Sequence, residues 1–247
     1  MRKPKLTTGN RAGDWLLLII FLLVAGVGIL TTTFLFKFDS GRTNLITEEV
    51  DVKEVQGESI VVLGDSLAQG VGATSSEKTL AAQIFASRKG AFPNATLWNF
   101  GLAGATVANV VGDQSQRLAA VKPAEIYLII GANDVTKQTP VESFAESYRN
   151  LLATLTGTGA KVVVVTIPKL AATPAVPEAQ KVAADTRTKL LNEKILAAAA
   201  EYPGKVRVVD GYAFSERELQ PGSDFLADDQ FHPNDDGYAK LAAEVVQ

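Results

Sequence analysis

The chain has 247 residues, of which 47% are hydrophobic, and its formal net charge is −3 at pH 7. It contains no cysteine, so disulfides and thiolate-bound metal sites are excluded. Residues 1–14 carry four basic side chains and one acidic one, which leaves about −6 on the rest of the chain, and this balance argues against a nucleic-acid surface, which needs a basic patch.

The first predicted element is a membrane span at residues 15–36, which contain no charged side chain. As an α-helix these residues would extend about 33 Å, close to the roughly 30 Å of a bilayer's hydrocarbon core. The alternative is a cleavable signal peptide, whose apolar core is usually about 7–15 residues long and ends in a small-x-small site. This block is longer and has no clear Ala-x-Ala, so we predict an uncleaved signal anchor, with cleavage near Ala25 and Gly26 or later left open. A buried core helix is disfavoured because the block has no polar face.

Charge sets the expected orientation of this anchor. Four basic residues precede it: Arg2, Lys3, Lys5 and Arg11. The positive-inside rule therefore assigns residues 1–14 to the cytoplasm, and the rest of the chain to the outer side of the membrane or, after cleavage, to secretion. Residues 37–56 are polar and are predicted to form a stalk, with a short strand near residues 49–55. Residues 57–247 fit one domain of ordinary size.

The domain alternates apolar β-forming runs with helical patterns. Strands are predicted at residues 59–63, 95–100, 125–130, 161–167 and 205–209. Helices are predicted at residues 79–88, 105–120 with a break near Gly112, 141–155, 186–201 and 236–246, and the Ala- and Pro-rich residues 170–178 are predicted to form a loop. Continuous apolar strands separated by helices are typical of an α/β fold with a parallel sheet covered on both faces. Ligands bind such sheets beyond the carboxyl ends of the strands, so functional motifs should follow the strands.

Four short motifs meet this condition. They are Gly64-Asp65-Ser66 after the first strand, Asn99-Phe100-Gly101-Leu102-Ala103-Gly104 after the second, Gly131-Ala132-Asn133-Asp134 after the third and, after a longer connection behind the fifth, Asp229-x-x-His232. Each alone has a simpler explanation as a turn, a helix cap or a surface-loop histidine, with Asp235 or Asp236 capping the last helix. Four motifs in order at one edge of the sheet, using the only histidine, favour a catalytic site instead.

The chemistry of these residues is that of nucleophilic catalysis. Histidine is the side chain whose unperturbed pKa lies near neutrality, and His232 is the only one in the chain. A serine hydroxyl becomes a good nucleophile when an adjacent base accepts its proton, which suits Ser66. Asp229 can hold the His232 tautomer and stabilise the imidazolium. Asp228 is the rival for this role, and the three-residue spacing to His232 favours Asp229.

As a set, the four motifs resemble the blocks of the SGNH hydrolases, the GDSL-type esterase and lipase superfamily, over residues 59–247. The stretch from Gly64 to Gly72 is similar to the opening of the lysophospholipase/thioesterase-like branch. The resemblance implies a flavodoxin-like three-layer α/β/α sandwich with a five-stranded parallel sheet. It also implies Ser66 as nucleophile, His232 as base and Asp229 as its partner. The implied oxyanion hole consists of the backbone N–H groups of Ser66 and Gly101 and the side-chain amide of Asn133, whereas Asp65 and Asp134 are expected to be structural.

The resulting hypothesis is a membrane-anchored, extracytoplasmic serine esterase that hydrolyses a small-molecule, lipid or glycan acyl ester or thioester without a metal or organic cofactor. An O-acetylesterase of cell-wall or surface glycans and an acyltransferase to a sugar are alternatives. A non-catalytic binding module is disfavoured because Ser66, Asn133 and His232 are all present. A flavin or nucleotide binder is disfavoured because no G-x-G-x-x-G loop follows the first strand. The acyl pocket is expected to be walled by residues 67–74, 102–107 and 170–185.

Overall fold

The computed structural model describes residues 58–247 of the chain. The predicted cytoplasmic segment 1–14, signal anchor 15–36 and stalk 37–56, with its short strand, lie outside the described residues. Within residues 58–247, no helix is both long enough and apolar enough to cross a membrane. The predicted division of the whole chain into these segments therefore stays a prediction.

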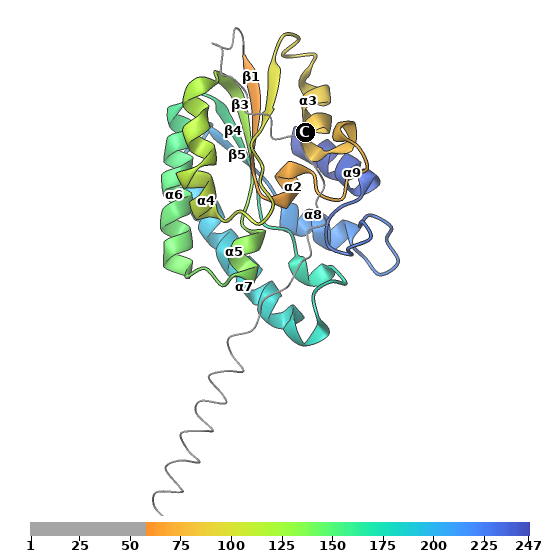
Figure 1. The fold of residues 1–247 in the computed structure, drawn as a ribbon. Helices are drawn as coiled ribbons and strands as arrows, with labels where there is room; N and C mark the ends of the chain where they lie inside the picture. Colours follow the sequence, from red (N-terminus) through yellow and green to blue (C-terminus); the bar gives the residue numbers. More distant parts are fainter. Residues whose placement is uncertain (1–57) are drawn as a thin grey trace, which may run out of the picture. The chain divides into compact units, whose positions relative to one another are not determined.

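Five parallel strands form one sheet in the described part of the chain (Figure 1). They are β1 (Ser59–Gly64), β2 (Thr96–Asn99), β3 (Pro123–Ile129), β4 (Lys161–Val165) and β5 (Val206–Val209). Their spatial order is β2-β1-β3-β4-β5, which is the flavodoxin-like order. The predicted parallel sheet is confirmed. In this order the switch point, where ligands bind, lies between the carboxyl ends of β1 and β3.

Alternate residues of each central strand face opposite helical layers, as the two-residue period of a strand requires. Leu63 of β1 and Leu128 of β3 belong to one apolar cluster, whereas Val62 and Ile129 belong to the other. Figure 1 shows the first face covered by α4 (Val107–Gly112), α6 (Val141–Gly157) and α7 (Glu178–Ala200). The second face is covered by α3 (Leu80–Arg88), α8 (Gly211–Glu218) and α9 (Asp235–Val246). Both faces of the sheet are therefore dry, which explains why its strands are nearly continuous apolar runs.

Between β4 and the last helix, the start of one predicted helix was wrong and another helix was missed. The predicted loop is confirmed for residues 170–177, which contain a short 3-10 turn, η3 (Leu170–Ala172). The helix predicted from residue 186, α7, already begins at Glu178. Pro177 precedes that first turn with φ −55°, a value its ring imposes and a helix start tolerates. The helix α8 was not predicted at all. Its signal is Asp210, whose side chain accepts a hydrogen bond from the Ala213 N–H as a helix cap.

Short helical turns follow the strands that lead to the predicted motifs. They are α2 (Ser66–Gln69) after β1 and α5 (Ala132–Thr136) after β3, and η1 (Ser76–Lys78) lies between α2 and α3. The predicted break near Gly112 is confirmed, because α4 ends there and the 3-10 helix η2 (Gln114–Ala120) follows. The predicted N-cap residue of α9 was wrong. The side chain of Asn234, rather than that of Asp235 or Asp236, accepts the Gly237 N–H at 2.9 Å.

Candidate active site

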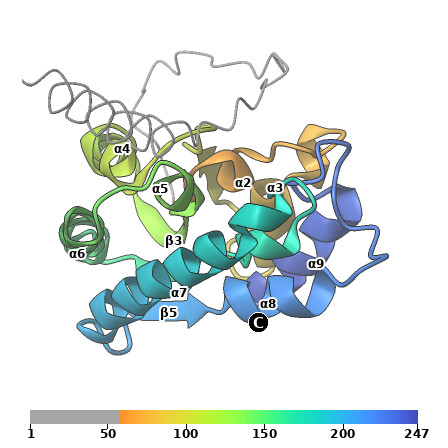
Figure 2. The ribbon, with the colours of Figure 1, turned by 90° about the horizontal axis from the view of Figure 1, so that it is seen from below.

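The turn that carries Ser66 is shaped by Gly64 and Asp65. Gly64 has φ +148°, and a Cβ there would lie 1.8 Å from the carbonyl oxygen of Ile129, so only glycine fits. The Asp65 carboxylate accepts the Leu67 N–H at 3.1 Å and caps α2, which begins at Ser66. Figure 2 shows α2 and α5 next to each other at this end of the sheet. The turn therefore directs Ser66 to the switch point between β1 and β3.

Ser66, His232 and Asp229 form one chain of hydrogen bonds. His232 Nε2 lies 2.8 Å from Ser66 Oγ, and His232 Nδ1 lies 2.5 Å from Asp229 Oδ2. His232 is buried, and the ring of Phe231 meets its imidazole edge-on with 5.1 Å between ring centres. The structure thus brings together three residues that stand up to 166 positions apart in the chain.

Asp229 determines which nitrogen of His232 carries the proton. Partial burial works to raise the pKa of Asp229, but hydrogen bonds from the His232 side chain and from the N–H groups of His232 and Phe231 outweigh it, and the pKa lies below its ordinary value. An ionised carboxylate only accepts hydrogen bonds, so Nδ1 of the neutral imidazole is the donor. Nε2 is then left as the acceptor that faces the Ser66 hydroxyl.

The loop between Asp229 and His232 is held by its own backbone. Gln230 has φ +57°, a left-handed conformation that lets Asp229 Oδ1 accept the N–H groups of both Phe231 and His232 at 2.9 Å. Asp228, the rival partner, is exposed and makes no side-chain hydrogen bond to any described residue. Of the two neighbouring carboxylates, Asp229 is therefore the one that the fold turns toward His232.

The loop after α2 clamps the segment that carries His232. The Thr74 hydroxyl and N–H both donate to the Asp235 carboxylate, at 2.6 and 2.9 Å. The buried Tyr238 hydroxyl donates to the Val71 carbonyl at 2.6 Å. Sequence reasoning had no signal for these contacts, because no motif links these residues, which stand more than 160 positions apart.

The predicted oxyanion-hole residues converge at the same end of the sheet, and two of their N–H groups are already engaged. The Gly101 N–H donates to Asn99 Oδ1 at 3.0 Å. A side chain at position 101 would strike α2, because a Cβ would lie 2.5 Å from the Gln69 nitrogen. The Asn133 amide donates to the Ala105 carbonyl at 3.0 Å and has a second N–H. The Ser66 N–H has no hydrogen-bond acceptor among the described residues.

Asp65 and Asp134 are both buried beneath this site. Burial raises the pKa of Asp65 to about 7, and the neighbouring Asp134 carboxylate raises it too, against the N–H groups of Leu67, Gly131 and Ala132. Burial also raises the pKa of Asp134, whose Oδ2 accepts the Val107 N–H at 3.0 Å. Both carboxyl groups therefore tie backbone segments of the site together.

The raised pKa of Asp65 makes stability depend on pH. The folded chain holds the Asp65 proton up to about pH 7, whereas 3.8 is the ordinary pKa of the unfolded chain, so the free energy of unfolding should fall as pH rises between these values. From pH 5 to pH 8 this loss should be about 3 kcal/mol. Urea unfolding at several pH values should show it in the wild-type chain and in Asp228→Asn, but not in Asp65→Asn. Equal pH slopes in all three proteins would rule out a raised Asp65 pKa.

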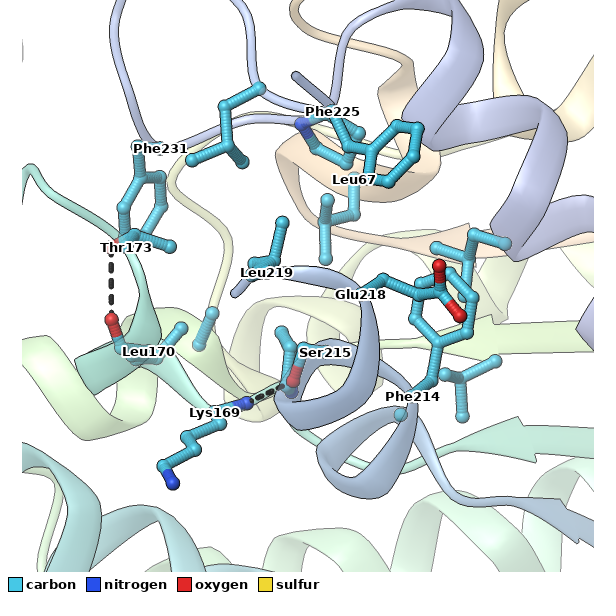
Figure 3. Close-up of a pocket in the computed structure, with 18 of the residues that line it drawn as sticks. Leu67, Lys169, Leu170, Thr173, Phe214, Ser215, Glu218, Leu219, Phe225 and Phe231 are labelled. Atoms are coloured by element: carbon cyan, nitrogen blue, oxygen red, sulfur yellow. Dashed lines mark hydrogen bonds between the residues drawn. The ribbon is translucent and has the colours of Figure 1, made fainter. Parts of the chain in front are cut away.

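An apolar cavity of about 70 Å³ begins at Ser66 and follows the carboxyl edge of the sheet toward α8 and α9. Figure 3 shows the side chains around it, among them Leu67, Leu170, Phe214, Leu219, Phe225 and Phe231. The predicted walls at residues 67–74 and 170–185 contribute to it, but no residue of 102–107 lines it. The rest of the lining comes from the ends of β3 and β4 and the residues after them, from α8, from residues 225–233 and from α9, none of which the sequence singled out as walls.

Comparisons with known proteins give a family match and a curated relative. The GDSL-like Lipase/Acylhydrolase family model matches residues 62–240. The chain is 29% identical over 191 residues to the GDSL-like esterase Rv1075c of Mycobacterium tuberculosis (strain ATCC 25618 / H37Rv), over 76% of this chain and 60% of that protein. The chain thus spans about 60% of the length of that curated relative.

Solved structures share the fold at low identity. A lipase/acylhydrolase from Enterococcus faecalis is 23% identical, with a TM-score of 0.60 over 76% of this chain and 93% of that one. A catalytic mutant of Axe2, an acetylxylan esterase from Geobacillus stearothermophilus, is 18% identical, with a TM-score of 0.58 over 78% of this chain and 94% of that one. Likeness at these identities concerns the arrangement of helices and strands.

Proposed function

The chain belongs to the GDSL-like lipase/acylhydrolase family, and from this premise we propose that it is a membrane-anchored, extracytoplasmic serine esterase that hydrolyses acyl esters through Ser66, His232 and Asp229. One observation carries the proposal. The chain of hydrogen bonds from Asp229 through His232 to Ser66, at 2.5 and 2.8 Å, ends next to an apolar cavity. A nucleophile, its base and room for an acyl group thus meet at one point.

The proposed reaction uses only groups of this chain, the substrate and water. Ser66 Oγ attacks the ester carbonyl carbon as its proton passes to His232 Nε2, and the bond to the alcohol then breaks. The departing alcohol oxygen takes the proton from His232. Water next repeats the attack on the acyl group, again giving a proton to His232, and the acid leaves as Ser66 regains its proton. Asp229 orients the ring and stabilises it when it is protonated.

The negative oxygen of each tetrahedral intermediate needs donors, and we assign this role to the N–H groups of Ser66 and Gly101 and to the Asn133 amide. One such donor typically contributes about 10²–10³ in rate. The Gly101 N–H is bound to Asn99 Oδ1, a neutral acceptor. A charged oxygen accepts a stronger hydrogen bond than a neutral one, so the intermediate can compete for this N–H. That donor then acts in the transition state more than in the ground state, which favours catalysis.

The cavity supports an apolar acyl group as the recognised part of the substrate. The charged residues that line it are paired: Glu218 with Lys240 at 2.8 Å, and Lys169 with Glu216 at 2.6 Å. The cavity therefore presents little unpaired charge to an acyl chain. A water molecule needs about 10–15 Å³ of such space, so the cavity offers room for about five groups of that size. A methylene group is similar in size to water, and we therefore propose acyl chains of about four to eight carbons. Acyl chains of this length favour a lipase-like esterase over an acetylesterase.

Ester hydrolysis should rise with acyl length up to this limit. A buried methylene contributes about 0.8 kcal/mol, so kcat/KM for p-nitrophenyl esters should rise up to about fourfold per methylene from acetate and fall beyond about eight carbons. Leu219→Trp should fill the cavity and move the preference to short chains. Leu196→Trp on α7 is the matched control, because Leu196 is 49% exposed and lies outside the cavity. Activity that peaks at acetate would refute the acyl-chain proposal and favour the O-acetylesterase or a sugar acyltransferase, which added glycan acceptors would reveal.

The membrane anchor is proposed from residues 15–36 alone. A helix of these uncharged residues would be long enough to cross the hydrocarbon core of a bilayer. The excess of basic side chains in residues 1–14 favours a cytoplasmic N-terminus, so the described domain would face the outer side. The full chain should stay in the membrane fraction after an alkaline carbonate wash. A truncated protein of residues 43–247 should be found in the soluble fraction. Release of the full chain by that wash would contradict the anchor.

A further inference from the structure

Gln114 is a buried polar side chain that contacts the nucleophile turn from outside all four sequence motifs. It lies in η2 and is 2% exposed. Its amide makes two hydrogen bonds to one residue: Oε1 accepts the Gly64 N–H at 2.8 Å, and Nε2 donates to the Gly64 carbonyl at 2.7 Å. Gly64 stands 50 positions earlier, two residues before Ser66.

These two hydrogen bonds take the place of β2, which no longer pairs with β1 at Gly64. In the β1–β2 register the last pair is Val62 and Asn99, and the Phe100 N–H still reaches the Val62 carbonyl. The N–H and C=O of Gly64, two residues on, point to the same side as those of Val62, because alternate residues of a strand share that direction. There the Gln114 amide presents one acceptor and one donor, as a neighbouring strand would.

The same Gly64 carbonyl also joins the two loops that supply oxyanion donors. It accepts the Leu102 N–H at 3.1 Å as well as the Gln114 amide. Leu102 follows Gly101, so this oxygen links the Gly101 loop to the strand end that leads into Ser66. The spacing between the N–H groups of Ser66 and Gly101 therefore depends on where the Gly64 peptide is held.

We propose that Gln114 is a positioning residue that sets the distance between the Ser66 and Gly101 N–H groups by holding both polar atoms of Gly64. The inference rests on the oxyanion hole proposed above. It predicts that loss of the amide acts on stabilisation of the tetrahedral intermediate more than on substrate binding. A misplacement of about 1 Å caused by a residue outside the chemistry can cost about 10²-fold in rate.

Gln114→Leu tests this in the full chain, because leucine has a similar size and neither of the two bonds. Titration with a fluorophosphonate counts the chains that carry a competent serine, so a fraction that fails to fold does not enter kcat. Per titrated site, kcat on p-nitrophenyl butyrate should fall about 10²-fold with KM nearly unchanged. The inhibition constant of phenylboronic acid, which forms a tetrahedral adduct, should rise by a similar factor.

Two further variants complete the experiment. Gln114→Glu keeps an acceptor for the Gly64 N–H, so its kcat should lie between those of the wild type and Gln114→Leu. Gln116→Leu, at an exposed position of the same 3-10 helix, should match the wild type. A wild-type kcat per titrated site in Gln114→Leu, or fewer titrated sites as its only change, would overturn the proposal and leave Gln114 a structural role. Activity retained by Ser66→Ala, measured alongside, would instead overturn the proposed function itself.

Discussion

Ser66→Ala is expected to lower kcat/KM for ester hydrolysis by about 10⁴-fold or more. Without Oγ no acyl-enzyme can form, and His232 has no proton to accept at 2.8 Å. Only attack by water, aided by the remaining donors, is left. The variant should fold normally, because alanine occupies the first turn of α2 at least as well as serine does and the cap from Asp65 remains.

The measurement combines rates with labelling. Full-length wild type, Ser66→Ala and Ser76→Ala are assayed on p-nitrophenyl butyrate and labelled with a fluorophosphonate. Ser76, in η1, is exposed and serves as the matched serine control. Hydrolysis and labelling should disappear only in Ser66→Ala, and the label on the other two chains should remain in the carbonate-washed membranes. Wild-type hydrolysis by Ser66→Ala would exclude Ser66 as the nucleophile.

Asp229→Asn is expected to lower kcat by about 10³–10⁴-fold with a small change in KM. An asparagine oxygen can still accept the N–H groups of Phe231 and His232, so the loop should keep its shape. The lost feature is the negative charge 2.5 Å from His232 Nδ1, which fixes the tautomer and stabilises the imidazolium. An amide facing that nitrogen can donate to it and so favour the wrong tautomer.

Asp228→Asn is the control for this change, because it removes the adjacent carboxylate with the same chemistry. Asp228 is exposed and directs no hydrogen bond to a described residue, so its loss should change kcat less than about threefold. As before, kcat is calculated per active site counted by fluorophosphonate titration. Equal losses in both variants would mean that the negative charge of the loop matters in general, and a loss in Asp228→Asn alone would reverse the assignment.

Local sequence patterns predicted those elements of the fold whose composition or periodicity is distinctive. The apolar runs of β1, β3 and β4 are buried on both faces, and such strands differ from the amphipathic helices around them in a way that composition reveals. Helix α8 was missed because a glycine opens it and its short sequence is half polar, so packing against the sheet rather than periodicity stabilises it. The early start of α7 was missed because Pro177 suggested a loop.

From the sequence alone, the parallel sheet and a set of candidate site residues could be predicted, because in such a sheet the motifs that follow the strands reach the same edge. How these residues meet depends on the tertiary structure. It engages the Gly101 N–H with Asn99, adds α8 and residues 225–233 to the lining of the cavity, and brings Gln114 to Gly64. Each of these outcomes depends on side-chain direction or on contacts between distant segments, which no local period or spacing encodes.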